Sequence, residues 1–257
     1  MRDQGLQEAI RAVGGVSELA RRVGISQPSV SNWDRIPAER VLFIETVTGI
    51  NRAILRPDLF SAVAAGDADE IDVARAQEYA LLAALLARAP DAGLLARLSE
   101  LRGNASPLGV AHAALGEAAS AANVERVERE FFNLFIGLGR GELLPYGSYY
   151  LTGFLHERPL ARLRGDLAAL GIERAEGQCE PEDHAAILCE IMSGLASGRF
   201  GAKTGADQQL FEKHLAPWLG RFFADLERAE ASDFYRRVGT LGREFMQIEA
   251  EAFALPS

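Results

Sequence analysis

Two runs in the second half of the sequence combine side chains that could recognise a partner. Residues 130–150 join an aromatic helix end to a glycine-rich loop, a proline and a tyrosine cluster. Residues 180–186 read Glu-Pro-Glu-Asp-His-Ala-Ala, with a proline and carboxylates at the start of a predicted helix, where the positive end of the helix dipole favours them. Aromatic rings offer apolar contact area and carboxylates offer acceptors. No nucleophile, base and orienting group can be assembled, so we expect no enzyme activity.

Each of these features also has a purely structural interpretation. Aromatic residues at helical spacing pack in a core more often than they line a groove. Asp183 and His184 could simply cap a helix. The glycine-rich loop at 137–141 lacks the Gly-Lys-Ser/Thr that follows in a Walker loop, so we interpret it as a connection between helices. Cys179, His184 and Cys189 are three potential zinc ligands, but their spacing matches no common site, and we predict no metal.

A second constellation lies near the N-terminus, where residues 19–33 fit two helices joined by a turn. Gly24 stands where the first helix must end, because glycine adopts a positive φ most easily. Ser26 is a suitable N-cap for the next helix, and Pro28 is tolerated in its first turn. These features agree and predict a helix-turn-helix. Its apolar contacts would be buried at Leu19, Val23, Ile25, Val30 and Trp33.

The elements that must position these residues are predicted to be helical throughout. Apolar side chains recur at three- and four-residue steps, and we find no run of alternating β-branched residues with hairpin turns. The predicted fold class is all-α, a small helix-turn-helix domain followed by a larger helical domain. The predicted helices span 4–13, 16–23, 27–33, 37–48, 51–55, 73–88, 91–102, 107–121, 124–136, 148–156, 159–170, 182–197, 207–229 and 232–253.

Prolines and a run of small, acidic residues divide the chain into parts. Residues 1–60 form the helix-turn-helix domain, in which Pro57 ends the first group of helices. Residues 61–72 are small and acidic and are predicted to be a linker. Residues 73–257 form the larger domain, where Pro217 is expected to break or kink the penultimate helix.

The charge is unevenly divided between these parts. The chain has 27 Lys or Arg and 36 Asp or Glu, a formal net charge of −9, and its hydrophobic fraction of 48% excludes wholesale disorder. Residues 1–58 contain 8 Arg and 7 acidic residues, which is weak attraction for DNA. The acidic remainder would attract a basic partner. Two cysteines exclude a disulfide framework. With no secretory signal and no apolar run long enough for membrane insertion, we expect a cytoplasmic protein.

The N-terminal part resembles the Cro-like helix-turn-helix domains, and most closely the YdaS-type modules, over residues 6–60. The resemblance implies that the second helix of the motif enters the major groove of DNA. Contacts to base edges or nearby phosphates would come from Gln27, Ser29, Ser31 and Asn32, and phosphate contacts from Arg21, Arg22 and Arg35. One module reads only a half-site, so useful affinity would need a dimer. The alternative is a packing or dimerisation module that no longer binds DNA.

Residues 73–254 resemble the TorD/DmsD family of chaperones for molybdoenzyme maturation. The family pattern has an aromatic helix end, then a Pro-x-x-Ser-x-aromatic stretch, then Glu-Pro-x-Asp-His. Gly147 departs from this pattern, because family members commonly have an acidic residue between the proline and the serine. One polar contact to the client is therefore left unassigned. The matching positions are Phe131, Leu134, Phe135, Pro145, Ser148, Tyr150, Glu180, Pro181, Asp183 and His184.

This resemblance implies a helical binding protein that holds the precursor of a molybdopterin oxidoreductase by its twin-arginine signal peptide until the cofactor is inserted. Such a peptide offers an apolar stretch and two arginines. An apolar groove for an amphipathic helix would come from Phe131, Phe135, Tyr146, Tyr149 and Tyr150. Carboxylates for the guanidinium groups would come from Glu180, Glu182 and Asp183. We expect no permanently bound cofactor; transient contact with the molybdopterin cofactor and a homodimer are left open.

Two functions follow from these resemblances. The first is a maturation chaperone, with a formate dehydrogenase as the expected client, in which the fused helix-turn-helix couples client occupancy to transcription. The second is a transcriptional regulator whose larger helical domain senses a small ligand or dimerises. Capture of a molybdoenzyme precursor would favour the first.

Overall fold

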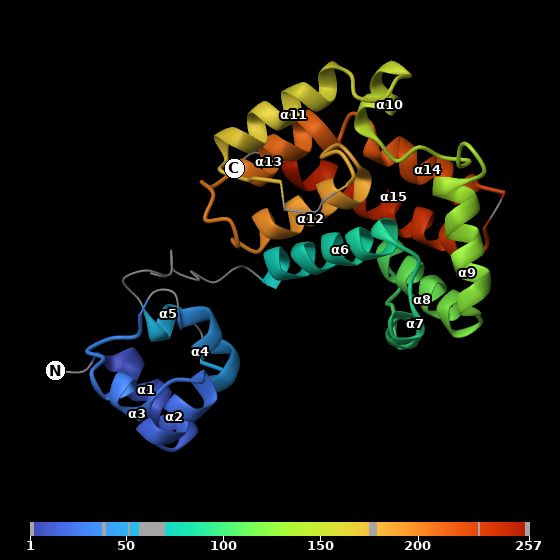
Figure 1. Ribbon diagram of the computed structural model, residues 1–257. Helices are drawn as coiled ribbons and strands as arrows, with labels where there is room; N and C mark the ends of the chain where they lie inside the picture. The colour runs from blue at the N-terminus through green and yellow to red at the C-terminus, as the bar shows by residue number, and fades with distance from the viewer. Residues whose placement is uncertain are drawn as a thin grey trace. The chain divides into compact units, whose positions relative to one another are not determined.

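The chain divides into two compact units, Met1–Asp67 and Ala68–Ser257, and each is described by itself. The computed structural model describes residues 3–37, 40–50, 52–56, 70–174, 179–230 and 232–254. All regular elements within these ranges are helices, which confirms the predicted all-α class (Figure 1). Residues 57–69, with Pro57 and most of the predicted linker, lie outside the described residues. No helix within the described ranges is both long and apolar enough to span a bilayer.

The helices of the smaller unit begin and end near the capping and helix-breaking residues of its sequence. Gly24 ends one helix with φ +73°, and the side chain of Ser26 caps the next by accepting a hydrogen bond from the Ser29 N–H. That helix stops at Ser31, two residues earlier than predicted, because Asn32 is its C-cap. The described helices are α1 (Gln4–Val13), α2 (Val16–Val23), α3 (Gln27–Ser31), α4 (Val41–Thr48) and α5 (Arg52–Leu55).

The apolar contacts expected of the motif are present. Leu19, Val23 and Val30 are buried, and Ile25 and Trp33 pack partly buried against the same cluster. This small core packs α2 against α3. A helix as short as α3 is not stable by itself, so this packing determines which of its side chains face outward.

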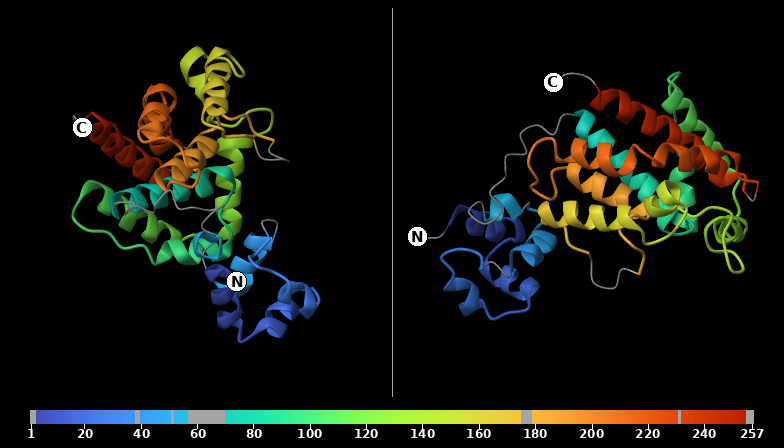
Figure 2. Two further views of the ribbon diagram at one scale, coloured as in Figure 1. Left: turned by 90° about the vertical axis from the view of Figure 1, so that its left-hand side faces the viewer. Right: turned by 90° about the horizontal axis from the view of Figure 1, so that it is seen from above.

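The larger unit contains longer helices with two π-helical segments. Its described elements are α6 (Glu70–Ala87), α7 (Ala92–Ser99), α8 (Pro107–Ser120), α9 (Val124–Phe131), η2 (Phe132–Ile136), α10 (Gly147–Thr152), α11 (Arg158–Ala169), α12 (Ala185–Ala196), α13 (Ala206–Leu210), η3 (Phe211–Leu215), α14 (Leu219–Arg228) and α15 (Phe234–Phe253). Helix α12 lies between α6 and α11, and α14 runs along α15 (Figure 1 and Figure 2).

Three boundaries in this unit have clear physical causes. The predicted helix at 207–229 is broken before Pro217, as expected, because proline has no N–H to continue the ladder. Helix α12 begins at Ala185 rather than at 182, since His184 is its N-cap. Helix α6 begins at Glu70, inside the predicted linker.

Glycines bring α14 and α15 into close contact. A Cβ at Gly242 would lie 2.3 Å from the Phe223 ring, and one at Gly239 would lie 2.3 Å from the Glu227 N atom. The core that surrounds this contact includes Trp218, Phe222 and Tyr235, all of them fully buried. This rigid pair supports the segment on which the candidate site is built.

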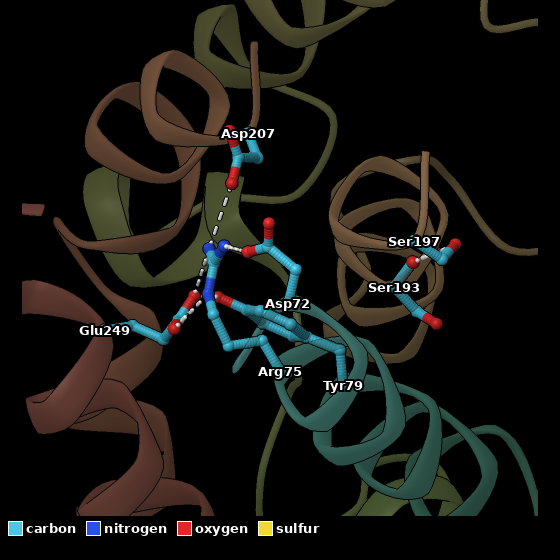
Figure 3. A network of polar contacts seen from close by, with 7 residues as sticks. All are labelled: Asp72, Arg75, Tyr79, Ser193, Ser197, Asp207 and Glu249. Atoms are coloured by element: carbon cyan, nitrogen blue, oxygen red, sulfur yellow. Dashed lines mark hydrogen bonds and ion pairs between the residues drawn. The ribbon is translucent and has the colours of Figure 1, made fainter. Parts of the chain in front are cut away.

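A buried polar network fixes the start of α6 (Figure 3). Arg75 Nε donates to Glu249 Oε1 at 2.7 Å, and its Nη2 donates to Glu249 Oε2 at 2.9 Å and to Asp207 Oδ2 at 3.0 Å. Tyr79 also donates to Glu249, whose side chain is 1% exposed. Burial lowers the pKa of Arg75, but its hydrogen bonds with the carboxylates raise it above the ordinary value. The network therefore ties α6 to α13 and α15.

We predict that Arg75→Met lowers the free energy of unfolding by about 3 kcal/mol or more, because it leaves the buried Glu249 carboxylate without its cation. Arg243→Met is the matched control, since Arg243 pairs with Glu227 where both side chains are about one third exposed. That change should cost about 1 kcal/mol or less. Urea denaturation measures both, and equal losses would contradict a special role for the buried network.

Candidate functional site

The two motif runs meet through Asp183, which clasps the start of α10. Its carboxylate Oδ2 accepts a hydrogen bond from Ser148 N at 2.7 Å, and its backbone oxygen accepts one from Gly147 N at 2.9 Å. Ala185 N donates in return to Pro145 O at 2.8 Å. The side chain of Asp183 is 3% exposed. We call these three hydrogen bonds the Asp183 clasp, and they join segments that are about 35 residues apart in the sequence.

His184 caps the helix that follows. Its Nδ1 accepts the Ala186 N–H at 3.1 Å, so a neutral ring must carry its proton on Nε2. Burial lowers the pKa of His184, although the negative charges of Glu180 and Asp183 act in the opposite direction. The sequence left open whether this pair caps a helix. His184 does so, whereas the Asp183 carboxylate serves another helix, α10.

Tyr146 links the clasp to Glu180. Its hydroxyl donates to Glu180 Oε2 at 2.6 Å, and its ring meets the His184 ring edge-on at 5.1 Å between centroids. Burial and the hydrogen bond to Glu180 raise the pKa of Tyr146, which keeps the hydroxyl protonated as a donor. The exposed Glu180 carboxylate is thus held in place next to the buried histidine.

Gly147 has a structural reason for its departure from the family pattern. A Cβ at this position would lie 3.0 Å from Trp218 Nε1 and 3.2 Å from Trp218 Cε2. Trp218 is buried and is itself fixed by donating from Nε1 to His214 O at 2.7 Å. A residue with a Cβ would require the Trp218 ring to shift slightly, whereas glycine leaves the ring in place.

A groove of about 640 Å³ opens between α6 and α12, and we call it the α6–α12 groove. It brings together six of the predicted site residues: Phe131, Phe135, Pro145, Tyr146, Glu180 and His184. The π-helical turn after α9 continues the aromatic wall, where the rings of Phe131 and Phe135 pack edge-on at 5.1 Å. Both rings also contact Tyr235 of α15, so the wall is anchored in the core.

The remaining predicted residues do not line this groove. Leu134 and Ser148 are fully buried, so direct contact with a client is not available to them in this conformation. Tyr149 and Tyr150 lie on α10, where the Tyr150 hydroxyl donates to Asp225 at 3.0 Å and the Tyr149 hydroxyl accepts from Arg140 at 2.6 Å. None of these four side chains lines the groove.

Two of the carboxylates expected to meet guanidinium groups are already engaged. The Asp183 carboxylate accepts a hydrogen bond from the backbone of α10. Glu182 accepts a hydrogen bond from Arg164 Nε at 2.9 Å. Burial raises the pKa of Glu182, but the hydrogen bond from Arg164, a backbone hydrogen bond and the nearby positive charges together hold this pKa below its ordinary value. A client guanidinium would therefore have to compete with the Ser148 N–H for Asp183 and with Arg164 for Glu182, so contact of these two acids with a client stays a prediction.

Sequence reasoning missed two thirds of the residues that line the groove. One wall is a stripe of alanines on α6, at Ala80, Ala83, Ala84 and Ala87. The other contains Glu190, a single carboxylate on an otherwise apolar helix, and Arg199 beyond its end. The i, i+3, i+4, i+7 spacing of these alanines places them on one face of a helix, so a helix face with small side chains could have been predicted from the sequence. The lone charge in Ala185–Ala196 was another, because it marks the exposed side of that helix.

Glu190 is the free carboxylate of the groove. It is exposed, and its side chain has no hydrogen bond or ion pair within the part of the chain that the structure describes. Its backbone oxygen accepts from Arg199 Nη2 at 3.4 Å, while the Arg199 guanidinium stacks on the Phe200 ring. Glu190 and Glu180 are therefore the acids that an incoming cation would meet.

No metal centre emerges from the described ranges, where no group of three His, Cys, Asp or Glu side chains could hold an ion. Cys189 is fully buried in the core, and burial raises the pKa of its thiol. Cys179 is exposed and lines the α6–α12 groove.

The smaller unit presents the predicted DNA-facing side chains at its surface. Gln27, Ser29 and Asn32 are exposed on or next to α3, and Ser31 is half-buried. Several of them bond to one another: Gln27 Nε2 donates to Ser31 Oγ at 2.9 Å, and the hydroxyls of Ser26 and Ser29 lie 2.7 Å apart. Binding a base edge would require these bonds to be exchanged.

The arginines of α2 are less free than the sequence indicated. Arg21 donates from Nη2 to Glu18 Oε1 at 2.7 Å, and Arg22 donates from Nε to the same oxygen at 2.8 Å. These hydrogen bonds lower the pKa of Glu18 to about 2, so the carboxylate stays ionised. Arg35 is exposed outside this cluster. One acid thus compensates two of the three arginines expected to contact phosphate.

Both units match known families. Residues 102–224 match the model of the family described as nitrate reductase delta subunit, and residues 6–64 match the one described as bacterial toxin YdaS.

Named relatives of the larger unit are chaperones. The chaperone protein TorD of Vibrio cholerae serotype O1 is 29% identical over 127 residues, which cover 46% of this chain and 58% of that protein. TorD of Aliivibrio fischeri is 26% identical over 135 residues, covering 49% and 63%. A probable Tat proofreading chaperone DmsD of Haemophilus influenzae is 28% identical over 125 residues, covering 48% and 60%. The chain spans about three fifths of the length of these relatives, whose names, as expected, are not those of enzymes.

We predict that Asp183→Ala lowers the free energy of unfolding by about 2–3 kcal/mol, because the buried Ser148 N–H loses a charged acceptor. Asp183→Asn keeps an acceptor oxygen of the same shape and should cost clearly less. Chemical denaturation compares the two. An alanine variant as stable as the wild type would contradict the clasp.

A pH dependence follows from His184. Its folded pKa lies below the unfolded value of about 6.5, so its contribution is present above that pH and is lost as the pH falls toward the folded pKa. His184→Asn supplies an oxygen that can accept the Ala186 N–H but does not titrate. Between pH 7.5 and 5.5 the wild type should therefore lose more stability than this variant. Parallel pH profiles of the unfolding free energy would contradict the assignment.

Proposed function

We propose that the larger unit is a chaperone of the TorD and DmsD kind and that it binds the twin-arginine signal peptide of a molybdopterin oxidoreductase precursor in the α6–α12 groove. Binding there would hold the precursor in the cytoplasm while its cofactor is inserted. The proposed role needs no resident cofactor, because the molybdopterin cofactor enters the client.

The observation that supports this most is the composition of the groove. Small alanines on α6 face aromatic rings at Phe131 and Phe135, with carboxylates at Glu180 and Glu190. An amphipathic helix fits an apolar groove of this kind, with its backbone close to the small side chains. The two arginines that precede the apolar stretch of a signal peptide can form charge-assisted hydrogen bonds with exposed carboxylates.

The charge of the chain supports the same partner. Outside residues 1–58 the chain has 19 Lys or Arg and 29 Asp or Glu. An acidic domain of this kind raises the encounter rate with a basic peptide, and the effect weakens as salt screens it. A formate dehydrogenase precursor is the client that we would test first.

The smaller unit adds a second proposed activity, operator binding that reports client occupancy. Its support is the match to a helix-turn-helix family together with the exposed polar side chains of α3. The runner-up function for the whole chain is a transcriptional regulator whose larger unit senses a ligand or dimerises.

We predict that Glu190→Gln weakens binding of a synthetic twin-arginine signal peptide to the full chain about tenfold, because it removes an unpaired carboxylate from the groove. Glu182→Gln is the matched control. It removes the same charge from a carboxylate that Arg164 already occupies, and it should change the affinity by less than threefold. Fluorescence anisotropy with a labelled peptide measures both.

Two outcomes would contradict the proposed function. Equal effects of Glu190→Gln and Glu182→Gln would show that only net charge matters and that the groove is not the site. Failure of the wild-type chain to capture a full-length molybdoenzyme precursor in a pull-down, with or without its signal peptide, would favour the regulator.

For the smaller unit, Glu18→Gln should strengthen binding to the promoter of the chain's own operon several-fold and steepen its salt dependence, because Arg21 and Arg22 become free for phosphate. Glu8→Gln on α1 removes the same charge away from these arginines and serves as control. Gel-shift titrations at several salt concentrations provide the comparison. If the two variants bind alike, Glu18 does not restrain the arginines.

A further inference from the structure

We propose that a second cavity, on the α10–α11 side of the larger unit, binds a small phosphate monoester. The cavity has a volume of about 770 Å³ and is lined by α10, α11 and the segment 213–218, with Asp183 and Leu188 from the α12 side. It shares no lining residue with the α6–α12 groove. We call it the α10–α11 cavity.

Cations surround this cavity. Arg158 and Arg162 stand one turn apart on the same face of α11, and both are exposed. Within the described part of the chain, neither guanidinium has a hydrogen bond, ion pair or ring contact. A third cation comes from Lys213, whose Nζ lies 3.5 Å from Asp166 Oδ2.

The charge balance favours an anion. Asp166 accepts a hydrogen bond from His214 Nε2 at 2.7 Å, which lowers its pKa and keeps it ionised beside Lys213. Asp183 is the other carboxylate of the lining, so the three cations leave one positive charge in excess. A phosphate monoester carries about −1.5 to −2 at neutral pH and offers three acceptor oxygens to guanidinium forks, whereas a carboxylate carries one charge.

The rest of the cavity fits the body of such a ligand. Apolar side chains of Leu151, Leu163 and Leu188, together with the Trp218 ring, line it. Asp183 also lines it, and one of its buried oxygens, Oδ1, accepts no hydrogen bond from the described residues.

Calorimetric titration of the full chain tests the proposal, with phenyl phosphate and benzoate as probes. Phenyl phosphate should bind saturably, and benzoate at least tenfold more weakly because it offers fewer acceptor oxygens and less charge. Arg158→Gln with Arg162→Gln should weaken phenyl phosphate binding at least tenfold. The control, Arg97→Gln with Arg102→Gln, removes the same charge from exposed arginines on or next to α7 and should leave it unchanged.

Equal affinity of the wild type and the Arg158/Arg162 variant for phenyl phosphate would overturn the site. Benzoate binding as tightly as phenyl phosphate would overturn the preference for a phosphate monoester over a carboxylate. The arginine variant should bind signal peptide as the wild type does. This result separates failure of the α10–α11 cavity from failure of the peptide groove.

Discussion

The arrangement of the larger unit around its candidate site depends on one buried carboxylate. Asp183 bonds to the backbone of α10 through Oδ2 and through its own carbonyl oxygen, and so joins two segments that are distant in sequence. Without it, the stretch that carries Pro145 and Tyr146 would be held by fewer contacts, among them the hydrogen bond from Ala185 N to Pro145 O. Because the tie uses a charged acceptor in a place with little water, its loss cannot be replaced by solvent.

The Asp183 clasp also separates two environments. His184, the next residue, lines the α6–α12 groove, while Asp183 lines the α10–α11 cavity on the other side of the same backbone. The groove combines small and aromatic side chains with two carboxylates, and the cavity combines apolar side chains with arginines. We therefore propose a basic apolar peptide for the groove and an anion for the cavity, two preferences that the acidic net charge of the unit does not distinguish.

Local sequence signals predicted the parts of the structure that depend on neighbours in the chain. The helix-turn-helix follows from Gly24 and Ser26, and the break before Pro217 from the missing N–H. The convergence of Phe131, Tyr146 and His184 in one groove followed from the family resemblance.

The direction of individual carboxylates could not be predicted in this way. Asp183 and Glu182 stand in an acidic run that fits a cap, a client contact or an ion pair equally well. Ser148 and Arg164 come close to these carboxylates only in the folded state, and their hydrogen bonds determine where Asp183 and Glu182 point. Glu190 was overlooked for the converse reason, since its helix has an apolar pattern and only packing against α6 shows which side remains open.

The most direct test of the central claim, that the α6–α12 groove holds the signal peptide, is to fill the groove. Ala84→Trp places a large ring on the alanine stripe of α6 at an exposed position, and Ala74→Trp places the same ring on the same helix outside the groove. Peptide affinity measured by anisotropy should fall at least tenfold for Ala84→Trp and stay within twofold of the wild type for Ala74→Trp. Equal affinity of the two variants would contradict the account.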